Sequence, residues 1–108
     1  MTVSELINRL GLTAHTLPDG ERTVTGCYVG DLLSWVMGHA PKGCVWITIM
    51  SNINVAAVAE LTDAACVVIA EGAVPDAELV DAARMHGINL LSSPKPAFNV
   101  CCDIEREL

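Results

Sequence analysis

Two continuous apolar runs constrain the fold of this chain more than any other feature. Val45 to Met50 reads VWITIM, and Cys66 to Ala70 reads CVVIA. A strand with one face in water alternates apolar and polar residues, whereas a strand buried on both faces is continuously apolar. Strands of the second kind belong to parallel sheets covered by helices on both sides. The two runs therefore predict an α/β domain built on a small parallel sheet.

Five helices are predicted around these runs. Ser4 is the expected N-cap of the first helix and Asp31 that of the second. Pro75 precedes the fourth helix, where proline is tolerated, and Gly87 closes it. The predicted helices are residues 4–10, 31–37, 53–61, 76–86 and 96–106.

Two further strands are predicted beside the apolar runs. The segment Thr23–Val29 is rich in valine, threonine and tyrosine, and Gly26 within it suggests a bulge. Ile88–Leu91 is the last short strand. Strands alternate with helices from Val45 onward, so right-handed crossovers between parallel strands are expected. The predicted fold is a single domain over residues 1–108, with a mostly parallel sheet and helices on both faces.

Composition narrows the functional classes. The net charge is −7, and the six lysines and arginines are scattered along the chain, so neither a nucleic acid nor an anionic membrane surface is an expected partner. The N-terminal residues carry no signal peptide pattern, which favours a cytoplasmic location. Apolar residues make up 52% of a chain too small to bury them all, and a homodimer is therefore expected.

The five cysteines do not form a recognisable framework. Their number is odd and no C-x-x-C pair occurs, so neither a disulfide scaffold nor the usual zinc or iron–sulfur spacing is present. Cys66 is expected to be a buried apolar side chain. Cys101 and Cys102 are neighbours whose side chains diverge on any regular element, which leaves a redox or metal role as the minor alternative.

Polar residues follow three of the predicted strands. In an open parallel sheet, ligands bind at the carboxyl ends of the strands, and a helix that begins there directs free backbone N–H groups at the ligand. We expect such a rim here. The predicted ligand-binding residues are Ser51, Asn52, Asn54, Glu71, Gly72, Ser92 and Ser93.

The same residue types have a purely structural interpretation. Serine and asparagine before a helix are ordinary caps, and a carboxylate such as Glu71 is commonly satisfied by a helix N-terminus. Nothing indicates catalysis: the chain lacks paired carboxylates, a G-x-S-x-G elbow and a G-x-x-x-x-G-K-[ST] phosphate loop. His15, His39 and His86 are expected at the surface. No metal or cofactor is predicted.

Three segments of the chain resemble one known family. They read VTGCYVGDLLSWVM, VWITIMSNINVAAVAEL and ACVVIAEGAVPDAELVDAARMHGINLLSSP, and the match in pattern around them runs from about Val24 to Phe98. In pattern they resemble the DRTGG domain family, whose members are regulatory modules attached to phosphotransacetylases and to pyrophosphatases with CBS domains. The resemblance implies a compact α/β fold related to the N-terminal domain of HPr kinase/phosphorylase. The motif Asp-Arg-Thr-Gly-Gly itself is absent, and Met50 to Asn54 read MSNIN after the VWITIM strand.

These observations lead to two hypotheses of different kinds. The first is a non-catalytic regulatory or ligand-sensing module that binds a nucleotide or another phosphorylated metabolite at the strand ends. The alternative is a protein-interaction subunit, a dimer that docks on a redox or signalling enzyme without a small-molecule ligand. A small enzyme is disfavoured because the motifs that would carry its chemistry are missing.

Overall fold

A five-stranded sheet divides the molecule, with its strands in the order β1-β5-β4-β3-β2. β2 to β5 are mutually parallel, and only β1 runs antiparallel to its neighbour β5. The prediction of a mostly parallel sheet is thus confirmed. In the computed structural model, which describes residues 1–108, the strands are β1 (Thr13–Thr16), β2 (Gly26–Val29), β3 (Cys44–Thr48), β4 (Cys66–Ile69) and β5 (Leu90–Ser92).

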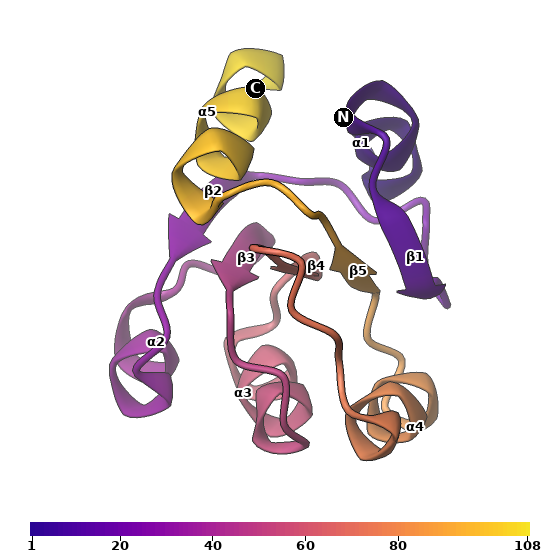
Figure 1. Ribbon diagram of the computed structural model, residues 1–108, viewed down its shortest axis with the longest axis vertical. Coiled ribbons are helices and arrows are strands. Elements are labelled where there is room, and N and C mark those ends of the chain that lie inside the picture. Colours follow the sequence, from indigo (N-terminus) through magenta and orange to yellow (C-terminus); the bar gives the residue numbers. More distant parts are fainter.

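Helices cover both faces of the sheet, as predicted. The helices are α1 (Val3–Leu10), α2 (Leu33–His39), α3 (Asn54–Thr62), α4 (Ala77–Met85) and α5 (Ala97–Glu107). Figure 1 shows α2, α3 and α4 on one face and α1 and α5 on the other. Each of the first three connects neighbouring parallel strands that advance in one direction, and crossovers of constant hand place all three on the same side. The second face is covered by helices from the two ends of the chain.

β1 is the element that the sequence does not reveal. It has four residues, it lies at an edge of the sheet, and its register with β5 shifts between Ala14 and Thr16. Neither a continuous apolar run nor a strict alternation marks it. The bulge expected at Gly26 is wrong, because β2 pairs with β3 in an uninterrupted register from Gly26 to Val29.

Two predicted helix caps are also wrong. Thr2, and not Ser4, caps α1: its hydroxyl accepts the Glu5 N–H at 3.2 Å, and the Glu5 carboxylate accepts the Thr2 N–H at 3.3 Å. This reciprocal pair is a capping box. Asp31 does not cap α2, because that helix begins two residues later with Leu32 as its N-cap and without a side-chain cap.

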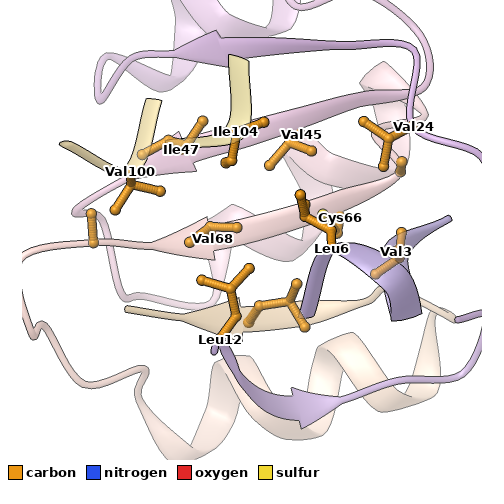
Figure 2. Close-up of a cluster of buried hydrophobic side chains, with 13 residues drawn as sticks. Val3, Leu6, Leu12, Val24, Val45, Ile47, Cys66, Val68, Val100 and Ile104 are labelled. Carbon is orange, nitrogen blue, oxygen red and sulfur yellow. The ribbon is translucent and has the colours of Figure 1, made fainter. Parts of the chain in front are cut away.

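The central strands are buried on both faces. On the face of α1 and α5, Val45 and Ile47 pack with Val68 and with Val100 and Ile104 of α5, as Figure 2 shows. On the opposite face, a second cluster of equal size gathers around the fully buried Trp46, and its indole N–H donates to the Gly30 carbonyl at 2.9 Å. The continuously apolar sequence of β3 follows from this double burial.

One buried polar side chain connects β5 to two other parts of the fold. Asn89 is 3% exposed, and its amide group donates to the carbonyls of Asp19 and Ala65 at 2.7 and 3.0 Å. Its side-chain oxygen accepts the Asp19 N–H at 3.0 Å. A single side chain therefore satisfies three backbone groups of the loop after β1 and of the start of β4.

We predict that Asn89→Ala lowers the free energy of unfolding by about 2–4 kcal/mol, because it leaves three backbone groups without their partner. Chemical denaturation monitored by tryptophan fluorescence measures the change. Asn99→Ala is the control, since Asn99 lies exposed on α5 and should change stability by less than about 0.5 kcal/mol. Equal effects of the two substitutions would contradict the role assigned to Asn89.

A second polar contact makes stability depend on pH. Asp63 ends α3 in a left-handed conformation with φ of 54°. The Arg22 guanidinium donates to the Asp63 carboxylate at 3.0 Å and to its carbonyl oxygen at 2.9 Å. This hydrogen bond and charge lower the pKa of the Asp63 carboxyl below its usual value.

We predict that Arg22→Ala destabilises the fold at pH 7 and that part of this loss disappears in acid. The folded-state pKa of Asp63 is the lower one, so its charged form stabilises the fold above the unfolded pKa, and the contribution is lost as the pH falls through the folded pKa. Because both side chains are partly exposed, we expect the substitution to lower the free energy of unfolding by about 0.5–1 kcal/mol at pH 7. Urea denaturation at pH 7 and in acid, below the folded-state pKa of Asp63, tests this. A loss of stability that does not depend on pH would assign the whole effect to the contact with the Asp63 carbonyl.

Candidate ligand-binding site

The order of the strands determines where a recess can form. From β2 to β5 each strand lies beside the next one in the sequence, so the strand order never reverses among the parallel strands. Reversals of this kind create the usual ligand crevice of open α/β sheets. Here the chain direction changes only between β5 and β1.

A depression of about 320 Å³ lies at that boundary. It brings together residues from β1, from the loop after β4 and from the end of β5. Three predicted site residues are among them: Gly72, Ser92 and Ser93. The lining residues are Thr13, His15, Gly72, Ala73, Val74, Pro75, Ser92, Ser93 and Pro94.

His15 and Ser92 form the polar centre of this depression. The His15 Nε2 and the Ser92 Oγ are hydrogen-bonded at 2.8 Å. Thr13 stands opposite Ser92 in the antiparallel pairing. Sequence reasoning placed His15 only at the surface because it missed β1. The hydroxyl-rich strand T-A-H-T would have been the available signal for this side of the site.

Hydrogen bonds between two loops fix the wall of the depression. Glu71 and Gly72 both have positive φ, 63° and 70°. The Glu71 N–H donates to the Lys95 carbonyl at 2.8 Å, and the Gly72 N–H donates to the Ser93 carbonyl at 3.1 Å. The Ser93 hydroxyl in turn accepts the Lys95 N–H at 3.2 Å. The loop after β4 is therefore held against the loop after β5, and these N–H groups have their partners within the protein.

The Glu71 carboxylate points out of this depression and toward α5. It accepts the Ala97 N–H at 2.8 Å, in the first turn of that helix. A carboxylate at a helix N-terminus is stabilised by the hydrogen bond and by the helix dipole. Glu71 thus has the structural role that the sequence left open as the alternative, although the helix is α5 and not the next one along the chain.

The other predicted residues lie apart from the depression, in the turn between β3 and α3. The Asn52 side-chain oxygen accepts the Asn54 N–H at 2.9 Å, and the Ser51 carbonyl accepts the Asp76 N–H at 2.9 Å. Asn54 lines a separate hollow of about 280 Å³ between α3 and α4. The predicted rim therefore divides into two groups. The first N–H groups of α3 already donate to residues of the turn before it.

A polar contact that sequence reasoning missed joins the ends of β2 and β3. The Asp31 carboxylate accepts the Thr48 hydroxyl at 2.8 Å and the Ile49 N–H at 2.9 Å. The Thr48 hydroxyl oxygen accepts the Met50 N–H at 3.1 Å. This carboxylate therefore has two partners in the fold and holds the two strand ends together.

The electrostatics of the β1–β5 depression are simple. Its lining residues include no lysine, arginine, aspartate or glutamate, so His15 is its one titratable group. No group of three or more histidine, cysteine, aspartate or glutamate side chains in the molecule is arranged to hold a metal ion. None of the helices combines the length and the hydropathy that a membrane-spanning helix needs.

Comparison with known proteins finds a similar fold. No protein-family model and no curated protein matches the chain. One similar solved structure contains the CBS and DRTGG domains of the regulatory region of Clostridium perfringens pyrophosphatase, complexed with its activator diadenosine tetraphosphate. The TM-score is 0.76 at 14% sequence identity, over 99% of this chain and 47% of that chain, so this chain spans about half its length. The likeness shows a DRTGG-related fold.

Proposed function

We propose that this chain is a non-catalytic regulatory domain that senses a small molecule in the β1–β5 depression. The observation that carries the proposal is the His15–Ser92 pair, two side chains with hydrogen-bonding capacity set into a recess whose walls are already fixed. The similar structure supports it, because that protein is a regulatory region and was solved with a nucleotide activator. A cytoplasmic location belongs to the same proposal.

The ligand we propose is a nucleotide or another phosphorylated metabolite that brings a single phosphate group to the recess. The net charge of −7 opposes a highly charged anion, and the depression has no lysine or arginine to offset several phosphates. One phosphate can be met by hydrogen bonds from the Ser92 hydroxyl, the Thr13 hydroxyl and the His15 ring. Diadenosine tetraphosphate is therefore a poorer candidate here than a monophosphate.

The His15–Ser92 pair does not by itself support an enzymatic function. A serine nucleophile needs a histidine base that a third group orients, and donors that stabilise the oxyanion. No carboxylate lines the depression, and the nearby N–H groups of Gly72 and Lys95 already donate within the protein. The pair fits ligand binding better than group transfer.

We predict that adenosine monophosphate or inorganic phosphate at millimolar concentration raises the Tm of the chain by a few degrees, since a ligand that binds only the folded state stabilises it. His15→Ala and Ser92→Ala should abolish this shift. His86→Ala is the matched control, because His86 pairs with Glu60 near the end of α4 and does not line the depression. Thermal unfolding followed by intrinsic fluorescence makes the comparison.

Two outcomes would count against this assignment. A ligand-induced shift that survives both substitutions but disappears in the double variant Asn52→Ala/Asn54→Ala would place the ligand at the β3–α3 turn, the other half of the predicted rim. No shift with any monophosphate, polyphosphate or dinucleotide at millimolar concentration would overturn the ligand-sensing function itself.

The second candidate function is protein interaction, including a homodimer. The observation that favours it is the exposure of four large apolar side chains on α2 and at the end of β2, the edge strand opposite β1. Val29, Leu32, Trp35 and Met37 are 53%, 67%, 57% and 47% exposed. Large exposed apolar side chains near a free strand edge are typical of surfaces that another chain covers.

We predict a dimer by analytical ultracentrifugation at micromolar concentration, and monomers for Met37→Glu, because a charge on α2 would be buried without a partner in the interface. Met85→Glu is the control, since Met85 is 81% exposed on α4 and lies away from β2. A native chain that sediments as a monomer would contradict the homodimer and leave only a different protein as the partner.

A further inference from the structure

A depression of about 560 Å³ lies between the edge strand β2 and helix α5, far from the β1–β5 depression in the order of the sheet. Cys27 and Val29 form its side on β2. Residues on α5 form the other side: Cys101, Cys102, Glu105 and Arg106. Three of the five thiols in the chain thus line one open recess.

The fold brings Cys27 and Cys101 together from distant parts of the chain. Side chains alternate along β2, so Cys27 packs against the core cluster under α5, whereas Tyr28 packs against the cluster on the opposite face. Cys101 packs against the same cluster from α5. The two thiols are close enough that Cys101 adds to the effect of burial in raising the pKa of Cys27 to about 12.

The other thiols provide an internal contrast. Cys44 and Cys66 are 0% and 1% exposed and belong to the core on opposite faces of the sheet. Cys27, Cys101 and Cys102 are only partly buried and line the recess. A reagent dissolved in water can therefore reach Cys27, Cys101 and Cys102, but not Cys44 and Cys66.

We propose that Cys27 and Cys101 are a thiol pair that low-molecular-weight disulfides, such as oxidised glutathione, convert into an intramolecular disulfide bond. Both residues line the same recess and pack against the same core cluster from two elements, so a cross-link would join β2 to α5 directly. Cys102 is not the expected partner of Cys101, because neighbouring residues on a helix diverge by about 100°. The proposal does not depend on the function of the β1–β5 depression.

The exchange takes place in two balanced steps. The Cys101 thiolate attacks one sulfur of the small disulfide, forms a mixed disulfide and releases one small thiolate. The Cys27 thiolate then attacks the Cys101 sulfur, forms the Cys27–Cys101 bond and releases the second small thiolate. The two protein thiols lose two electrons and two protons, and the small disulfide gains them as two thiols.

Two properties of the recess determine the behaviour of this reaction. Burial raises the pKa of both thiols, so the thiolate fraction and the rate should increase about tenfold per pH unit around neutral pH. The product would join β2 to α5 across most of the length of the chain. A cross-link that closes a long loop restricts the unfolded state, and we expect it to raise Tm by about 5 °C or more.

The experiment treats the full reduced chain with oxidised glutathione at pH 8.5, without denaturant. Peptide mapping should identify a Cys27–Cys101 link, and mass spectrometry of the linked peptides should show the loss of two hydrogen atoms. In Cys27→Ser, Cys101 should stop at the mixed disulfide, which peptide mapping identifies as one glutathione on Cys101. Cys102→Ser and the core control Cys44→Ala should still form the link.

Other outcomes overturn the proposal. These are a Cys101–Cys102 link, a mixed disulfide on Cys102 with Cys27 still reduced, or no reaction until the chain unfolds. If Cys44→Ala or Cys27→Ser weakens the fold, the reactive thiols of the unmodified chain are counted instead, before and after denaturation. About three thiols should react in the folded chain and five after denaturation. Five fast thiols in the folded chain would also overturn it.

Discussion

Burial of both faces of β3 and β4 is the constraint on which the rest of the structure depends. Their apolar side chains point alternately into two core clusters, so each face needs a helical layer. The connections between parallel strands supply only one layer, because they all cross on the same side. The chain must supply the second layer from its ends, and the ion pair between Arg9 and Glu107 at 3.1 Å joins the two terminal helices there.

The sequence predicts the parts of this fold that depend on burial and misses those that depend on pairing. The double burial of β3 and β4 is visible in VWITIM and CVVIA because every position must be apolar. β1 is held by pairing with β5 at an edge, which demands little of its four side chains. Asp31 illustrates the same limit. Its place just before an apolar helical pattern favours a cap, yet its carboxylate accepts hydrogen bonds from Thr48 and Ile49, which no local pattern encodes.

The sequence indicated the end of the sheet at which the candidate site lies, but not which residues line it. Parallel strands bring their carboxyl ends to one edge, and Gly72, Ser92 and Ser93 do meet there. Whether a polar group remains available for a ligand depends on contacts across the fold. Glu71 binds the start of α5, whereas Ser92 meets His15 from a strand that sequence reasoning did not find.

Both recesses follow from how a five-stranded sheet is covered. On the side of α1 and α5, two helices about 10 Å across must cover strands that are about 4.8 Å apart. Two helices barely span the width of five strands. Cys27 and Val29 at the β2 edge therefore remain within reach of solvent beside α5. At the other edge, the single antiparallel pair interrupts a regular series of parallel strands and leaves the ends of β1 and β5 beside a hollow. The inner strands are sealed by burial, so these two recesses lie toward the edges of the sheet.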